Sequence, residues 1–382
     1  MVSERARATT AFEAMEVLDK ANELEDVIHL EVGEPDFEPP APAVEAAVDA
    51  LRGGGLGYTA AKGKPELRDR IATYYDRRYG VDIDTERIVV TPGSSPALLL
   101  SYLAVIDPGQ EAILTDPHYA CYPNFVRQAG GELKYVTLDP STGFRPDLDA
   151  FQRAISPNTQ TVMVNSPSNP TGAVLSDAEL AELTTMVERA DAVMVADEAY
   201  HGLDYDQRAP SVLEHTQDAF VVDTFSKRFG MTGWRLGWLV VPPAYTDTVN
   251  RLAQNLIICA SEFVQDAGIA ALDAAPEFVP EIRDTYRERR DYVLDRIHDL
   301  GISLDYIPGG AYYVLLDVSH LGDAFSVADT LLEEARVALT PGRDFGPTAA
   351  PYLRLSYARS LEELATGLDR IERTLPTMAE QR

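Results

Sequence analysis

Lys227 is the residue of this chain whose type and surroundings most favour covalent chemistry. It follows the apolar run 219–223 and lies among small hydroxyl residues and glycines. A lysine in such a place is partly desolvated, which favours the neutral amine that forms a Schiff base. Taken alone, it would be better explained as a solvated loop lysine. However, the chain has only five lysines, and the other four lie in charged or glycine-rich contexts typical of a surface.

Asp197 is a second candidate, because it directly follows the apolar run 193–196. A carboxylate at the end of a buried strand must be paired or hydrogen-bonded. A protonated ring nitrogen of a cofactor would serve, and so would a structural arginine. Tyr200 follows three residues later, where its hydroxyl either reaches the same ligand or belongs to an ordinary core tyrosine.

The segment from Gly93 to Pro96 precedes a helical run at 97–105. Ser94 or Ser95 suits the cap of that helix, and Pro96 suits its first turn. The free N–H groups and the dipole of such a helix start form an anion site, although a plain capping motif is the commoner use. The pattern is neither a Walker A loop nor a dinucleotide fingerprint, which disfavours nucleotide binding.

Two arginines stand among apolar neighbours, Arg235 in 233–238 and Arg354 in 352–357. A guanidinium in or beside a strand is costly unless it holds a carboxylate or phosphate through two hydrogen bonds. Each is therefore a candidate anion ligand, and the alternative for each is a structural ion pair with one of the many acidic residues.

Short apolar runs that alternate with helical stretches predict the elements that position these residues. Their continuous Val, Ile, Leu and Met character is typical of strands buried on both faces, and their spacing fits crossover helices. We expect an α/β fold with a largely parallel sheet. The seven runs are 87–91, 111–115, 134–138, 161–165, 192–196, 219–223 and 236–241.

Polar residues follow several of these runs, and ligands bind outside the carboxyl ends of the strands in such sheets. The pattern turns helical at about 246–300, and mixed strands and helices follow Gly309 and Gly310. We therefore expect a large α/β domain at 46–275, with residues 1–45 and 276–382 forming a smaller α+β domain.

Composition excludes several classes of protein. Hydrophobic residues make up 45% of 382 residues, which excludes a disordered chain. The 61 acidic residues outnumber the 33 basic ones, and the net charge of −28 is the wrong sign for binding nucleic acid or anionic membranes. Two cysteines are too few for a disulfide scaffold or a zinc site. No spanning run or signal peptide is expected, so the interpretation is a cytoplasmic protein.

The acidity, together with the scarcity of lysine, suggests a host with high internal salt, where screening reduces self-repulsion. Full stability and activity at low ionic strength, with no gain in molar salt, would contradict this halophile-like interpretation of the surface.

Taken together, the motifs resemble the pyridoxal-phosphate-dependent aminotransferases of class I and II, in the aspartate aminotransferase superfamily with fold type I. The resemblance covers nearly the whole chain in the order of the family, and the block around Lys227 is highly specific. The matching segments are 30–37, 58–59, 63–67, 169–172, 197–200, 226–238 and 354–357.

The resemblance implies a role for each matching catalytic residue. Lys227 would hold the cofactor pyridoxal 5'-phosphate as a Schiff base and then act as general base and acid. Asp197 would keep the pyridine nitrogen protonated, which makes the ring an electron sink. Asn169 and Tyr200 would hydrogen-bond the 3-oxygen of the ring.

The same resemblance implies that Ser94, Ser95, Thr224 and Arg235 cradle the phosphate and that Tyr119 stacks on the ring. Thr224 stands where many relatives have serine, which keeps the hydroxyl. Tyr119 stands where aspartate-specific members often have tryptophan, so stacking is kept while substrate preference is left open.

Substrate binding is assigned by the resemblance to Arg354, which would clamp the α-carboxylate with help from Gly33 and Asn169. Tyr58 would reach the phosphate across a homodimer interface. No arginine that would read a side-chain carboxylate is recognisable, and the stretch 254–261 offers no cation.

We therefore expect an aminotransferase that moves an amino group from an aspartate-type, aromatic or broad range of L-amino acids to a 2-oxo acid, with 2-oxoglutarate the expected acceptor. A carbon–sulfur lyase would use the same cofactor residues. A cofactor-binding regulatory protein is disfavoured, because a basic DNA-binding region is missing and the charge is strongly negative.

Overall fold

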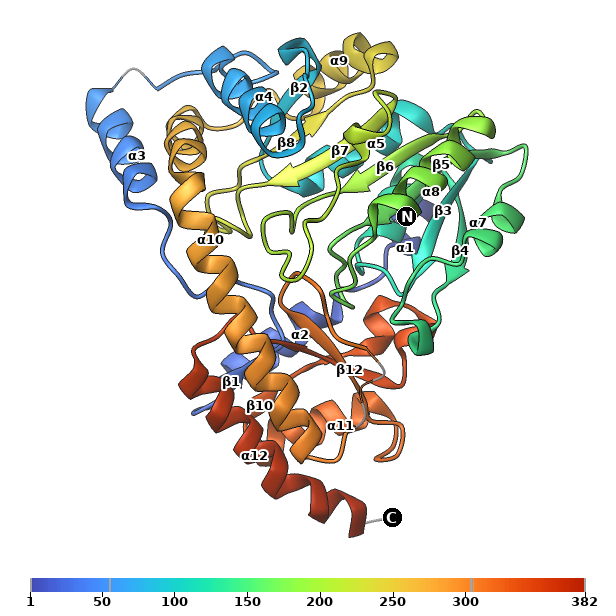
Figure 1. Ribbon diagram of the computed structural model, residues 1–382, viewed down its shortest axis with the longest axis vertical. Coiled ribbons are helices and arrows are strands. Elements are labelled where there is room, and N and C mark those ends of the chain that lie inside the picture. The colour runs from blue at the N-terminus through green and yellow to red at the C-terminus, as the bar shows by residue number, and fades with distance from the viewer. Residues whose placement is uncertain (1, 55, 303, 305, 381–382) are drawn as a thin grey trace.

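The computed structural model describes residues 2–54, 56–302, 304 and 306–380. A seven-stranded sheet forms the centre of the larger part of the molecule (Figure 1). Its strand order is β2-β8-β7-β6-β5-β3-β4. The strands are β2 (Ile88–Thr91), β3 (Glu111–Asp116), β4 (Glu132–Thr137), β5 (Thr159–Asn165), β6 (Val193–Asp197), β7 (Ala219–Thr224) and β8 (Gly237–Val240).

Each predicted apolar run overlaps one of these strands, and the prediction of an α/β fold with a largely parallel sheet is confirmed. Only β8 runs against its neighbours, since it pairs antiparallel with both β2 and β7. The largest shift is in β4, which begins two residues before the predicted run and ends before Leu138. β4 lies at the edge of the sheet and is partly exposed, so its apolar pattern marks its ends poorly.

The sheet is covered by helices on both faces, because alternate side chains of every strand point to opposite sides. In β7, for example, Phe220 and Val222 belong to one core and Val221 to the other. On the side of Phe220 lie α5 (Ser94–Val105), α6 (Tyr122–Ala129) and α9 (Thr246–Leu256). On the side of Val221 lie α4 (Pro65–Tyr79), α7 (Leu148–Ala154), α8 (Asp177–Arg189) and part of α10 (Glu262–Asp299).

A second, smaller core is built from the C-terminal part of the chain. Its antiparallel sheet has the order β11-β12-β9, and a short parallel pair joins β1 to β10. Helix α11 is followed by a π-helical turn at 331–335. The elements are β1 (Ile28–His29), β9 (Tyr313–Asp317), β10 (Val337–Ala338), β11 (Thr340–Pro341), β12 (Tyr352–Ser356), α11 (Ala324–Thr330) and α12 (Leu361–Glu380).

Helix α10 is 38 residues long and contributes to both cores (Figure 1). Val264 and Ala271 pack into the core of the large sheet, whereas Tyr286 and Ile297 pack into the smaller core. The domain boundary that we propose, at residues 275 and 276, therefore falls inside a helix.

The N-terminal segment contributes α1 (Glu4–Ala8) and α2 (Glu13–Asn22), and α3 (Ala41–Gly53) packs against α10. Among the described residues, no helix is long and apolar enough to cross a membrane.

Candidate active site

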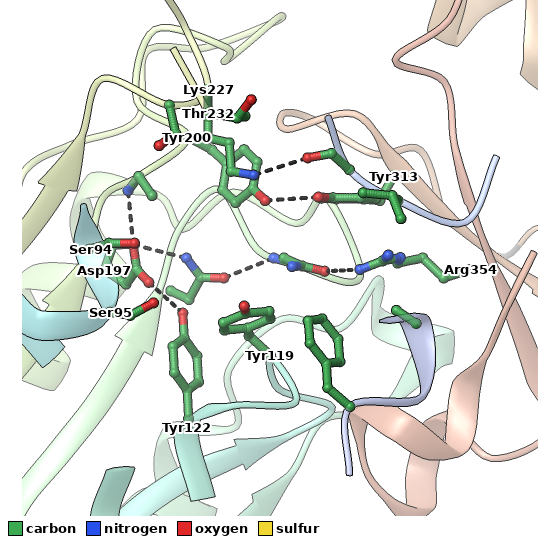
Figure 2. A pocket seen from close by; sticks show the side chains of 18 of the residues that line it. Ser94, Ser95, Tyr119, Tyr122, Asp197, Tyr200, Lys227, Thr232, Tyr313 and Arg354 are labelled. Atoms are coloured by element: carbon green, nitrogen blue, oxygen red, sulfur yellow. Dashed lines mark hydrogen bonds between the residues drawn. The ribbon is translucent and has the colours of Figure 1, made fainter. Parts of the chain in front are cut away.

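A cavity of about 200 Å³ lies where the strand ends of the large sheet meet the smaller core (Figure 2). Ten of the twelve predicted site residues line it, although they come from segments more than 300 residues apart. These ten are Gly33, Ser94, Ser95, Tyr119, Asn169, Asp197, Tyr200, Lys227, Arg235 and Arg354.

Asp197 is the last residue of β6, and its buried carboxylate faces this cavity. Its two oxygens accept hydrogen bonds from the Tyr122 hydroxyl at 2.7 Å and from the Ala199 amide at 3.0 Å. Burial raises the pKa of Asp197, and the hydrogen bond from Tyr122 opposes that rise. No arginine or lysine among the described residues forms an ion pair with Asp197, so the structural-arginine alternative is wrong.

The end of β5 fixes the position of Asp197 through Asn165, which is its partner in the strand register. The Asn165 amide donates to the Asp197 carbonyl at 3.0 Å, and its side-chain oxygen accepts the Asn169 N–H at 2.8 Å. One asparagine therefore ties together two strand ends and the loop that carries Asn169.

Lys227 lies in the loop after β7, and its Nζ donates to the Gly33 carbonyl at 3.0 Å. Each of the other four lysines forms an ion pair with an aspartate or glutamate. Lys227 is the one lysine that no described carboxylate approaches within 4 Å, and its Nζ lies 5.8 Å from the centre of the Tyr200 ring. This amine points into the cavity instead of toward a surface acid (Figure 2).

The start of α5 and Arg235 form a cradle for an anion. The cap of α5 is Gly93, with a φ of 89°, so the prediction that a serine caps this helix is wrong. Ser94 and Ser95 are instead the first two helical residues. A Cβ on Gly93 would lie 2.5 Å from Arg235 Nη2, so only glycine lets the guanidinium lie against this backbone. The early N–H groups of α5 have no side-chain cap and carry the positive end of its dipole.

Arg354 is buried in β12, at the opposite end of the cavity from this cradle (Figure 2). Its Nη1 donates to Asn169 Oδ1 at 2.9 Å and its Nη2 donates to the Glu31 carbonyl. The guanidinium lies between the rings of Tyr313 and Phe345, 4.4 and 4.7 Å from their centres. These acceptors and the Thr340 hydroxyl, 3.4 Å from Nη2, are all neutral, so no ion pair with a described carboxylate forms and the alternative of a structural ion pair is wrong.

Tyr200 is buried and lines the cavity, where its hydroxyl lies 2.9 Å from that of Tyr313. Burial raises the pKa of Tyr200 well above its usual value, so the hydroxyl stays protonated. A Cβ on Gly33 would lie 1.6 Å from the Tyr313 hydroxyl oxygen. Glycine at position 33 is thus required for Tyr313 to enter the site.

Two predicted residues lie outside the cavity. Thr224 is buried behind it, where its hydroxyl is within 2.9 Å of both the Leu236 carbonyl and the Ser226 hydroxyl. Ser226, one layer closer, is the residue that lines the cavity. Tyr58 is 86% exposed, in the segment between α3 and α4.

Sequence reasoning missed several lining residues. Tyr122 had a usable signal, because it is a second tyrosine only three residues after the predicted Tyr119. The other missed residues carry no local signal of this kind. They include Phe12, Ala14, Met15, Val32, Asn165, Ala199, Ser226, Thr232 and Tyr313.

Comparison with known proteins identifies relatives over nearly the whole chain. Residues 25–371 match the family described as aminotransferase class I and II. The aspartate/prephenate aminotransferase of Thermus thermophilus is 37% identical, and the match covers 98% of each chain. The valine–pyruvate aminotransferase of Mycobacterium tuberculosis is 36% identical over 92% of each chain. The solved structure of Thermus thermophilus aspartate aminotransferase with maleate superposes with a TM-score of 0.93 at 36% identity, covering 98% of this chain and 99% of that one.

Proposed function

The chain belongs to the class I and II aminotransferase family and is a pyridoxal-phosphate-dependent transaminase, and we propose that the cavity described above is its active site. The main support is that Lys227 and Asp197 line the same cavity and that neither forms an ion pair with a described residue. Pyridoxal phosphate would supply a partner for each: an aldehyde for the lysine amine and a basic ring nitrogen for the aspartate.

The residues present fit that cofactor. The uncapped start of α5, the space left by Gly93 and the Arg235 guanidinium suit a phosphate. Asp197 suits a protonated pyridine nitrogen, since a cation beside a buried carboxylate offsets its desolvation. We propose that Tyr119 contacts the ring face and that Thr224 acts through Ser226.

Bound there, the cofactor supplies an electron sink for the pair left behind when the substrate loses its α-proton. Lys227 Nζ would accept that proton and return it to a neighbouring carbon. Asn169 and the Tyr200 hydroxyl would hold the ring oxygen, and Asp197 would keep the ring nitrogen protonated.

Arg354 is proposed to bind the substrate α-carboxylate. Its Nε has no hydrogen-bond partner among the described residues, and its guanidinium stacks on the Tyr313 ring. Because both half-reactions use one site, the same guanidinium would bind the carboxylate of the amino acid and of the 2-oxo acid.

The experiment that tests this function compares Lys227→Ala with Lys134→Ala, a lysine paired with Glu111 far from the cavity. The purified protein should show a visible absorption band that an amino donor bleaches, and Lys227→Ala should lose both the band and turnover. Turnover retained by Lys227→Ala would contradict the proposal. Pyruvate and ammonia released from cysteine-type substrates without an oxo acid would indicate a lyase instead.

We further propose 2-oxoglutarate as an acceptor and an aspartate-type, aromatic or broad donor range, acting in the cytoplasm. Relatives with names as different as aspartate/prephenate and valine–pyruvate aminotransferase are about equally similar to this chain. A panel of donors against 2-oxoglutarate, at low and molar salt, tests both the substrate range and the halophile-like surface. No turnover with 2-oxoglutarate for any donor would contradict the acceptor.

A homodimer is proposed because apolar side chains are exposed around an open groove beside the cavity. The groove is lined by Val44, Leu51 and Phe263, and the nearby Tyr58 is almost fully exposed. We propose that Tyr58 reaches the partner's phosphate cradle. Light scattering of the protein and of Leu51→Glu tests this, with a monomeric mass for the unmodified protein as the contradicting result.

A further inference from the structure

A second cavity, of about 250 Å³, lies between α4 and α10. It shares no lining residue with the candidate active site, and nothing in the proposed reaction uses it. Its walls come from one side of each helix, from the turn at Gly202 and from Arg228.

Five arginine side chains gather at this cavity, and four of them form ion pairs: Arg70 with Asp273, Arg78 with Asp204, Arg228 with Asp223 and Arg283 with Asp284. Five arginines and a single acidic residue, Asp273, line it, against a net charge of −28 for the chain. Arg77 forms no ion pair with any described residue, so its charge is uncommitted. The five arginines are Arg70, Arg77, Arg78, Arg228 and Arg283.

Two buried polar atoms at this cavity have no hydrogen-bond partner among the described residues. They are the Tyr74 hydroxyl oxygen and Arg228 Nε. Arg228 is 1% exposed, and its guanidinium lies 4.9 Å from the centre of the Tyr74 ring. A buried donor without a partner is destabilising. Each of these atoms exposes less than 1 Å², so a ligand with acceptor oxygens would reach them only after a shift of the two side chains.

The α10 side of the cavity is mainly apolar, apart from Asp273 and Arg283 on the same helix. Its apolar part is formed by Leu272, Ala275, Pro276, Val279 and Pro280. These five side chains are hydrocarbon and offer an apolar surface to a ligand.

We propose that this cavity binds a small amphipathic carboxylate, with its apolar body against α10 and its carboxylate against the guanidinium groups. Guanidinium forks match carboxylates geometrically, and the apolar wall would add the hydrophobic part of the affinity. An inorganic anion would contact only the guanidinium groups and would gain nothing from the apolar wall. The inference is independent of the substrate proposed for the active site.

An occupant would also contact the segment that carries Lys227. Arg228 follows Lys227 directly and donates to both Asp223 oxygens, at 3.0 and 2.9 Å, and to the His201 carbonyl at 3.0 Å. Binding at Arg228 is therefore placed to alter turnover from outside the active site.

The test is calorimetric titration of the holoenzyme with 3-phenylpropionate after aminooxyacetate has blocked the active site. One binding event should remain. The double variant Arg77→Gln/Arg283→Gln should weaken it at least tenfold, and Val279→Trp should abolish it by filling the cavity. The matched control Arg153→Gln removes an exposed charge from α7 and should leave the affinity unchanged.

Uncharged 3-phenylpropanol and inorganic phosphate, which each lack half of the proposed ligand, should bind at least tenfold more weakly. No binding of 3-phenylpropionate to the blocked enzyme, equal affinity of the double variant, or equal affinity for 3-phenylpropanol would overturn the proposal. Because the readout is heat of binding, failure here leaves the transaminase assignment untouched.

Discussion

Asp197 and Glu198 are consecutive and both buried, yet they face opposite sides of the end of β6. Asp197 faces the candidate active site. Glu198 faces a closed region, where its carboxylate accepts from the Ser211 hydroxyl at 2.9 Å and the Val212 amide at 3.0 Å. Burial raises the pKa of Glu198 to about 8, so the protein neutralises this group with a proton.

Asp223, on the next strand, shows a second way to neutralise a buried carboxylate. Burial raises its pKa to about 6, and the ion pair with the buried Arg228 opposes that rise. On the closed side, then, each carboxylate has its proton or its cation within the protein. On the cavity side Asp197 forms no ion pair with a lysine or arginine of the described residues, and this difference supports our proposal that it binds the cofactor ring.

Asp197→Asn should give the largest effect on catalysis in this comparison. Turnover should fall about 10²–10³-fold, the range for losing one preorganised electrostatic group. The free energy of unfolding should change by less than about 1 kcal/mol, since the amide removes a buried charge. Steady-state kinetics and urea unfolding in one buffer measure both. Turnover within tenfold of the unmodified protein would remove the contrast with Glu198.

Asp223→Asn should instead affect the stability of the protein. It leaves the Arg228 guanidinium buried without its counter-ion, which should lower the free energy of unfolding by about 3–5 kcal/mol. The double variant Asp223→Asn/Arg228→Met, measured by urea unfolding, should recover part of that loss. A single variant as stable as the unmodified protein would mean that this pair is not a structural one.

Glu198→Gln tests the same comparison through the pH dependence of the free energy of unfolding. The folded pKa of about 8 exceeds the unfolded value of about 4.3. The stabilising contribution is complete below the unfolded pKa and is lost as pH rises through 8. The stability of the unmodified protein relative to Glu198→Gln should therefore fall between pH 5 and 8, by at most about 1.4 kcal/mol per pH unit. A constant difference across these pH values contradicts a protonated Glu198.

Tyr122→Phe should give the smallest effect, because it removes one hydrogen bond to Asp197. A bond to a charged group contributes about 1.5–3 kcal/mol, so a loss of at least about tenfold in turnover is expected. The control is Tyr102→Phe in α5, whose buried hydroxyl has no partner among the described residues. Equal turnover in the two variants would separate Tyr122 from catalysis.

The fold and the centre of the site were predictable because both depend on local patterns. Runs buried on both faces identified the strands, and a parallel sheet brings the residues that follow them to one edge. Asp197 and Lys227 could therefore be placed together without knowing their contacts. The lone antiparallel strand β8 could not be identified, since an apolar run has no direction.

The outer wall of the site depends on contacts between distant segments. Tyr313 enters through the space left by Gly33, 280 residues earlier, and Phe12 and Met15 arrive from the N-terminal segment. No spacing within a short window carries that information. The cap of α5 was mispredicted because serine and glycine both suit such a position, and the left-handed backbone at Gly93 decided between them.

Helix α10 has a mechanical consequence. Between Pro280 and Asp299 it extends about 28 Å at about 1.5 Å per residue. Prolines inside a helix are where its axis bends most readily. A change of about 5° in direction at Pro280 would carry the far end through about 2.5 Å. Pro280 lines the second cavity, the one with five arginines, so a bend at this residue would displace the smaller core, which includes the strand of Arg354.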